Sequence, residues 1–260
     1  MKAVLHIIEH DLRNFFRYKW WLAGLISMNL ADLLIMAVVY NHMVSAEIAE
    51  QIRSYLDFFA PGVTVLGLFV SAFMIGREIN MEVRRQIHHY LLSLPITRLE
   101  LALGRLLAGG FRGMMYTSPL LLTTFVFVGF PSFPQLIVIL AALFLLATGI
   151  AGVSIITAVS TTSFEKFVTA RGLVYYVLFF CSSVFYPLSL IQTLGQEGVM
   201  PQAIVVLAEL NPLSSGADLI RSFLLGTPAF ALDMMRNLIA FSLIFTTTAT
   251  FAYMKIIERR

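Results

Sequence analysis

Six long apolar stretches constrain what this chain can fold into more than any other feature. A helix that crosses a bilayer needs about 20 mostly apolar residues. Such stretches occupy residues 20–40, 58–76, 114–130, 136–159, 173–191 and 237–254. Only 13% of the residues are charged, against about 25% in soluble domains. We therefore expect an all-α integral membrane protein, with six transmembrane helices in a single transmembrane domain over residues 1–260. A cytosolic enzyme, a disordered tail and a disulfide scaffold are excluded.

The positions of the Lys and Arg residues predict the orientation, because these residues resist translocation. If the N-terminus is cytoplasmic, only Arg53, Arg221 and Arg236 of the eighteen lie outside, which leaves fifteen inside. Arg105 and Arg112 then belong at the cytoplasmic side, where residues 99–110 extend the third helix. This predicts a multi-pass protein of the plasma or inner cell membrane with both termini in the cytoplasm. The net charge of +3 reflects topology and membrane lipid, with no nucleic-acid partner.

Residues 1–19 predict a helix that lies along the cytoplasmic membrane interface. Apolar side chains in residues 4–16 recur at helical spacing, and charged side chains occupy the other face. The segment is too polar to cross a bilayer and is typical of an interfacial helix. Arg13 and Arg17 are expected beside anionic headgroups. A plain interfacial anchor, with no further role, is the alternative.

Residues 77–98, between the second and third spans, are the most charged part of the chain. They contain a short apolar face made by Ile87, Tyr90, Leu91 and Leu94. Pro95 ends this segment, because the residue before a proline disfavours the helical conformation. The pattern predicts a short amphipathic cytoplasmic helix held between two spans, which suits the docking of a soluble partner. A solvated charged loop is the alternative.

The last outer segment, residues 192–233, is long and still apolar. Its two apolar runs, 203–208 and 219–225, are each too short to cross a bilayer. Asn211-Pro212 separates them as a turn, and Ser214 or Ser215 is expected to cap the second helix. We expect a re-entrant helical hairpin before the sixth span, whose bent backbone must be buried in protein or face water. Such a hairpin suits a lid or the lining of a path, and a simple outer cap is the alternative.

Motifs for nucleotide, metal or nucleophilic chemistry are missing from the sequence. There is no G-x-x-x-x-G-K-[ST] phosphate loop, so the chain does not bind ATP by that route. His88 and His89 are adjacent, so on a helix they point in different directions and cannot hold one metal. The charged residue within the six spans is Asp32, with Asn29 nearby. These two are candidates for a cavity or a subunit interface.

Three groups of residues together resemble the ABC-2 type membrane subunit of an ATP-binding-cassette exporter. The first is Glu82 followed by the run LLSLPITR at 91–98 and ELALGR at 100–105. The second is Tyr186-Pro187-Leu188 at the end of the fifth span. The third is Ala208–Leu213 (AELNPL), followed by Asp218 and Arg221. The resemblance covers nearly the whole chain in length, span count and order.

The resemblance implies two such subunits, as a homodimer or a related heterodimer, with two copies of a separate ABC-type ATPase. ATP and Mg would then be bound by that ATPase, and this chain would hold no cofactor. The residues expected to couple to the ATPase are Arg13, Arg17, Glu82, Arg84, Arg85, Gln86, His88, His89, Leu91, Leu92 and Pro95. Those expected at the outer gate are Pro187, Glu209, Asn211, Pro212, Asp218 and Arg221. Family members often carry an acid just before the paired leucines, and here we expect His88 or His89 to supply that polar contact.

These observations favour a permease subunit that exports an amphipathic or lipidic substrate. It would not itself be an enzyme. One alternative is an intramembrane enzyme, which needs at least two convergent reactive groups where the spans offer Asp32 alone. The other is an ion-coupled secondary carrier, which normally needs more ionisable residues within the membrane.

Overall fold

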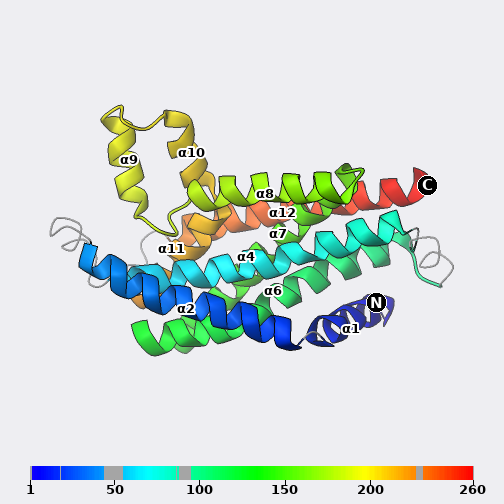
Figure 1. The fold of residues 1–260 in the computed structure, drawn as a ribbon, viewed down its shortest axis with the longest axis horizontal. Helices are drawn as coiled ribbons and strands as arrows, with labels where there is room; N and C mark the ends of the chain where they lie inside the picture. The colour runs from blue at the N-terminus through cyan, green and yellow to red at the C-terminus, as the bar shows by residue number, and fades with distance from the viewer. Residues whose placement is uncertain are drawn as a thin grey trace.

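A computed structural model describes residues 2–17, 19–43, 55–85, 87, 95–226 and 231–259 of the chain. All the regular secondary structure in these ranges is helical (Figure 1). The helices are α1 (Lys2–Arg17), α2 (Lys19–Met43), α4 (Tyr55–Arg84), α6 (Arg98–Val128), α7 (Phe133–Ser160), α8 (Phe164–Phe180), α9 (Leu188–Gln196), α10 (Gln202–Leu210), α11 (Pro212–Leu224) and α12 (Ala231–Arg259). The all-α prediction is confirmed.

Helix α4 is the centre of an elongated bundle and packs against α6 and α7, while α12 packs along α7. Its side chains are buried along most of its length, and Leu68, Phe69 and Phe73 are at most 1% exposed. The outer faces of the bundle are apolar too, with large exposed side chains such as Leu243 and Ile244 of α12. Both termini lie at the same end of the bundle (Figure 1).

Three helices are long and apolar enough to cross a membrane: Tyr55–Arg84, Phe133–Ser160 and Ala231–Ile257. The bent pair α10 and α11, at 60°, brings the number to four if it counts as one span. The expected count of six is therefore not confirmed in the described residues. Polar residues such as Arg105 and Arg112 interrupt α6, and α8 has only 17 residues.

The expected fifth span, 173–191, has different boundaries in the structure. Helix α8 begins at Phe164, because the Ser163 side chain caps it by accepting from the Lys166 amide. It ends at Phe180, followed by a non-helical turn at residues 181–187. The side-chain amide of Asn211 donates to the carbonyls of Leu178 and Cys181 at this end. The long apolar stretch is thus divided because the side chain that caps α11 also binds the last carbonyls of α8.

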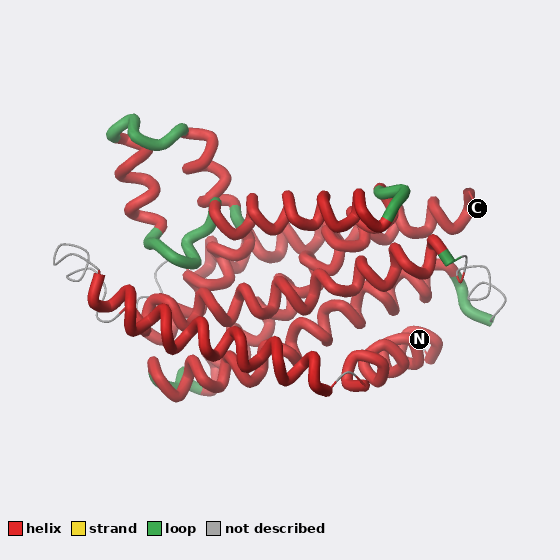
Figure 2. Tube along the Cα trace, in the orientation of Figure 1, coloured by secondary structure: helices red, strands yellow, loops and turns green. Residues whose placement is uncertain are grey.

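The two short helices α9 and α10 project sideways from the end of the bundle opposite the termini (Figure 2). Helix α10 then bends into α11, which is buried against α4 and α12. The expected pair of short helices separated at Asn211-Pro212 is present in the structure. The cap was predicted wrongly: Asn211 caps α11 by accepting from the Leu213 amide, so neither Ser214 nor Ser215 does so.

Candidate functional site

Helix α1 lies against α6 at the end of the bundle that carries both termini. It buries Ile8, Asp11 and Phe15, which share one face. The other apolar residues of α1 are half-buried or exposed, and Leu5 and Phe16 are among the exposed ones. Asp11 therefore places a carboxylate, 1% exposed, at the centre of the inward face of an amphipathic helix. Sequence reasoning gave Asp11 no role, although its spacing from Ile8 and Phe15 puts it on the apolar face.

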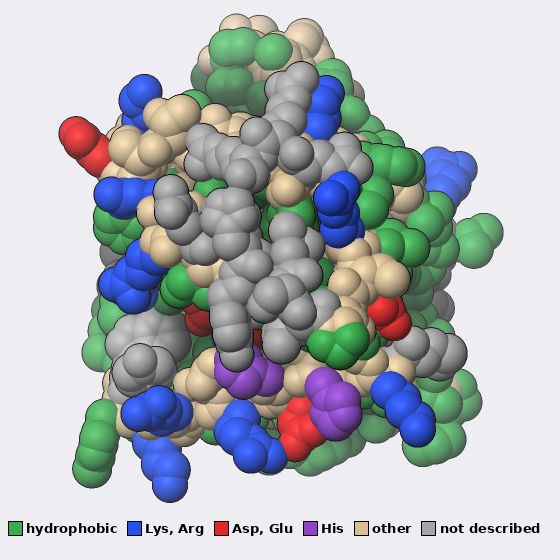
Figure 3. Space-filling view, turned by 90° about the vertical axis from the view of Figure 1, so that its right-hand side faces the viewer, with side chains coloured by type: hydrophobic (Ala, Val, Ile, Leu, Met, Phe, Trp, Pro, Cys, Tyr) green, Lys and Arg blue, Asp and Glu red, His purple; other side chains and the backbone are tan. Residues whose placement is uncertain are grey.

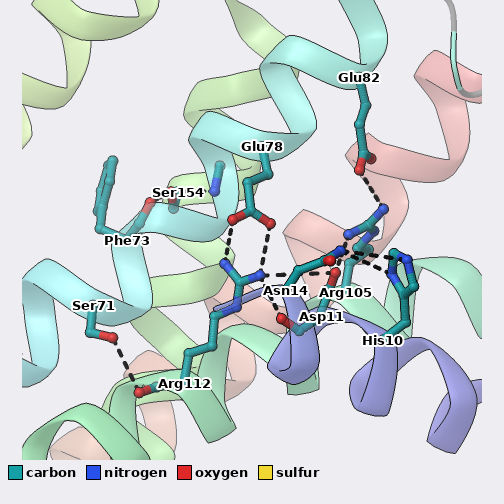
Figure 4. A network of polar contacts seen from close by, with 11 residues as sticks. His10, Asp11, Asn14, Ser71, Phe73, Glu78, Glu82, Arg105, Arg112 and Ser154 are labelled. Atoms are coloured by element: carbon teal, nitrogen blue, oxygen red, sulfur yellow. Dashed lines mark hydrogen bonds and ion pairs between the residues drawn. The ribbon is translucent and has the colours of Figure 1, made fainter. Parts of the chain in front are cut away.

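Asp11 joins an ion network with residues of α4 and α6 (Figure 4). The guanidinium of Arg105 lies 2.5 Å from a carboxylate oxygen of Asp11 and 2.5 Å from one of Glu82. Arg112 binds both carboxylate oxygens of Glu78, at 2.6 and 2.8 Å. It also donates to the backbone carbonyl of Asp11, at 3.1 Å. Three helices thus meet at two arginines.

Asp11 and the two arginines of the network are buried, whereas Glu82 and Glu78 are partly exposed. Arg105 is 5% exposed and Arg112 is fully buried. Burial opposes the charge on Arg105, but the carboxylates of Asp11 and Glu82 outweigh it and raise the pKa of this guanidinium. Removing one partner from a buried ion pair costs about 3–5 kcal/mol, because it leaves an uncompensated charge. The network therefore holds α1, α4 and α6 together as one unit.

Two further groups complete the packing around the arginines. The Phe15 ring of α1 lies 5.3 Å from the guanidinium carbon of Arg112. Tyr253 of α12 is buried and lies close enough to Arg105 for the two groups to interact electrostatically. The last span thus lies beside the same cluster.

The sequence predicted one member of this network, Glu82, and missed four: Asp11, Glu78, Arg105 and Arg112. A signal was present in the sequence. Glu78 and Glu82 are one helical turn apart, and Arg105 and Arg112 are two turns apart, so an acidic stripe on α4 faces a basic stripe on α6. This charge pattern predicts that the two helices pack side by side.

The other expected coupling residues lie around this end of the molecule. Arg13 and Arg17 are exposed on α1, and Arg13 pairs with Glu9 at 2.6 Å. Arg84 and Arg85 are exposed at the end of α4, and Pro95 is exposed before α6. Lys and Arg side chains gather at this end of the molecule (Figure 3). Five expected residues lie outside the described part of the chain: Gln86, His88, His89, Leu91 and Leu92.

At the opposite end, Arg221 fastens the turn at 181–187 to the bundle. Its guanidinium donates to the carbonyls of Phe58 at 2.8 Å, Ser183 at 2.7 Å and Val184 at 3.0 Å. It also pairs with Asp218 and lies 3.6 Å from the centre of the Phe58 ring. The bent backbone is thus satisfied inside the protein, as a membrane environment requires.

Of the expected outer residues, the structure brings Asn211, Pro212, Asp218 and Arg221 together. Asp218 accepts from the Ser183 hydroxyl at 2.7 Å. The other two lie apart: Pro187 precedes α9, and Glu209 is exposed and accepts from Gln192 at 2.8 Å.

The remaining candidates, Asn29 and Asp32, lie on α2. The Asn29 amide donates to the Tyr116 hydroxyl of α6 at 2.7 Å. This bond ties α2 to the bundle. The side chain of Asp32 lies outside what the structure describes.

An apolar helical bundle with an amphipathic helix clamped to one end defines a multi-pass membrane protein. The chain belongs to the ABC-2 type transporter family, which residues 3–225 match. It is also similar to the daunorubicin resistance ABC transporter permease protein DrrB1 of Streptomyces coeruleorubidus. That protein is 24% identical over 233 residues, which cover 88% of this chain and 78% of the relative. The chain is accordingly the membrane subunit of an ABC exporter.

Proposed function

We propose that this chain is the permease half of an exporter that moves an amphipathic or lipidic molecule outward. Two copies of a separate ABC-type ATPase, which bind ATP and Mg, would supply the energy. A second permease subunit, identical or related, would complete the complex, with both termini in the cytoplasm. The observation that carries the proposal is the buried network joining Asp11 of α1 to Arg105 and Arg112 of α6.

The ion network gives a route for mechanical coupling. Closure of the ATPases would press on the exposed face of α1 and on residues 77–98. Asp11 would transmit that displacement to Arg105 and Arg112, and they would transmit it to Glu82 and Glu78 on α4. Because both arginines are buried and each binds a carboxylate of α4, α1, α4 and α6 are expected to move together rather than slide past one another.

The outer end would act as the gate. Helix α11 is held to the turn at 181–187 by Asn211 and Arg221. Both side chains bind backbone carbonyls. Because Arg221 donates to the carbonyl of Phe58, a shift of α4 at Phe58 would displace Arg221 directly. We expect α10 and α11 to move with this turn when the substrate leaves.

Two observations bear on the class of substrate. The relative is a drug resistance permease, and the bundle here presents apolar side chains on its outer faces, such as Leu243 and Ile244 of α12. Both observations favour a substrate with a large apolar part, such as a drug, an antibiotic, a lipid or a glycolipid.

The test uses the complex with its ATPase, reconstituted in proteoliposomes. Asp11→Asn should leave basal ATP hydrolysis in place but reduce substrate-stimulated hydrolysis and transport by about tenfold. The matched control is Asp233→Asn, which removes an exposed ion pair with Arg236 at the other end of the bundle. Full coupling in Asp11→Asn would contradict the proposed route. Transport driven by an ion gradient without ATP would contradict the exporter itself.

A further inference from the structure

Helices α4 and α8 meet along a seam in which most side chains of α8 are half-buried or exposed. Phe167 is the one residue of α8 that is buried. The rings of Phe69 and Tyr175, 5.6 Å apart, join the two helices. Beside this contact, half-buried apolar side chains share a face on each helix. They are Val70 and Met74 on α4, and Val174 and Leu178 on α8.

Two arginines lie at the end of the seam nearest the termini. Arg77 follows Val70 and Met74 on the same face of α4, and Arg171 precedes Val174 and Leu178 on the same face of α8. Arg171 is half-buried and Arg77 is exposed. Burial and then the positive charge of Arg77 lower the pKa of Arg171.

No described carboxylate relieves this repulsion. Among the described residues, the charge of Arg77 acts on Arg171 and the phenol of Tyr175 opposes it, and within those residues neither guanidinium has a hydrogen bond or ion pair. Glu78, next to Arg77, binds Arg112 with both oxygens. Glu165 is exposed on a different face of α8. Within the part of the chain that the structure describes, two cations therefore face the seam with no carboxylate between them.

We propose that Arg77 and Arg171 bind the phosphate headgroup of an anionic phospholipid, whose acyl chain lies in the seam. A guanidinium binds phosphate through two parallel hydrogen bonds, so two of them can neutralise one headgroup from both sides. An anion at this position turns the repulsion into attraction.

The apolar part of the seam fits an acyl chain. From Arg171 to Leu178 the helix rises about 10 Å, and one leaflet of hydrocarbon is about 15 Å thick. The arginines lie at one end of this path and the apolar side chains continue from it, which matches the polarity of a lipid. Lipid binding at this site does not require transport, so it can be tested independently of the proposed function.

The test uses the full chain purified in a neutral, lipid-free detergent. Phosphatidylglycerol should raise its melting temperature more than phosphatidylcholine does. The double variant Arg77→Gln, Arg171→Gln should lose this difference. Its affinity for phosphatidylglycerol, measured by native mass spectrometry, should fall about tenfold or more, because a hydrogen bond to a charged group is worth about 1.5–3 kcal/mol.

A second readout separates binding from folding. In lipid-free detergent the double variant should melt at the same temperature as the native chain or higher, because the repulsion is gone. Arg236→Gln, an exposed arginine paired with Asp233, is the matched control and should respond to phosphatidylglycerol like the native chain. If the glutamine variant does not fold, the variant Arg77→Lys, Arg171→Lys is used instead. It keeps both positive charges but lacks the planar guanidinium group that makes two parallel hydrogen bonds. Its affinity for phosphatidylglycerol should fall by about threefold or more.

Three results would overturn the proposal. Equal stabilisation of the double variant by phosphatidylglycerol would show that the arginines do not bind it. The same shift of the native chain with inorganic phosphate alone would mean a site for a soluble anion rather than a lipid. A change in subunit assembly with unchanged lipid binding would place the two arginines at a protein interface.

Discussion

Asp11 and Arg105 are separated by 94 residues in the sequence, yet a carboxylate oxygen of one lies 2.5 Å from a guanidinium nitrogen of the other. Asp11 belongs to a helix that is too polar to cross the membrane, and Arg105 to a helix that enters the bundle. The pair therefore attaches the peripheral part of the molecule to its core. Because both residues are almost completely buried, water cannot replace either partner without opening the contact.

Asp11→Ala should destabilise the protein by about 3–5 kcal/mol, because Arg105 and Arg112 lose a buried negative partner. Unfolding by a denaturing detergent, followed by circular dichroism, measures the change. Glu9→Ala is the control on the same helix: Glu9 pairs with Arg13 but both side chains are exposed, so the cost should be at most about 1 kcal/mol. If the two variants cost the same, the network does not hold α1 in place.

At the other end, Arg221→Met should loosen the turn at 181–187. The substitution keeps an unbranched side chain but leaves the carbonyls of Phe58, Ser183 and Val184 without their charged donor. Several unsatisfied buried carbonyls should cost about 3 kcal/mol or more in total. Hydrogen exchange should show faster exchange at Ser183, whose amide donates to Ser214.

The control for this prediction is Arg236→Met, which removes an exposed arginine of α12. It should leave exchange in the turn unchanged. Protection of the turn in Arg221→Met equal to that in the native chain would show that Asn211 and Ser214 are sufficient to hold it.

Much of the helical architecture could be predicted from apolar periodicity, because that signal is local. Residues 4–16 have the pattern of an amphipathic helix, and the break at Asn211-Pro212 was marked by a turn dipeptide. The end of α8 at Phe180 could not be predicted in this way. It depends on Asn211, which donates to Leu178 and Cys181 from 33 and 30 residues away, and no local pattern records that contact.

The candidate site was predicted less well, for the same reason. Glu82 was identified through a motif, whereas Glu78, Arg105 and Arg112 were interpreted as part of a positive cytoplasmic edge. Their pairing depends on α4 and α6 lying side by side. Charge counts along a chain predict topology, but the contacts between charges require the packing of helices.

Close packing of α7 against α12 leads to a further prediction. A Cβ at Gly152 would lie 2.6 Å from the backbone oxygen of Phe245, which cannot move aside as a flexible side chain can. Gly152→Ala should therefore cost about 1–3 kcal/mol. At Gly172 on α8, an added methyl group would have nothing within 4 Å, so Gly172→Ala should be neutral or stabilising. Thermal unfolding of the two variants in one detergent makes the comparison, and equal melting temperatures would refute the close contact.

The start of α6 gives a prediction about pH. The backbone amide and the hydroxyl of Thr97 donate to the Glu100 carboxylate, and these hydrogen bonds lower the pKa of Glu100 from its ordinary 4.5. Because the folded pKa is lower than the unfolded one, the stabilisation is complete above the unfolded pKa and is lost as the pH falls through the folded pKa. Hydrogen exchange in the first turn of α6 should thus become faster, relative to the intrinsic rate, as the pH is lowered below 4.5. Glu100→Gln should remove this dependence, because its amide does not titrate, and a pH profile unchanged by that substitution would assign the effect to another group.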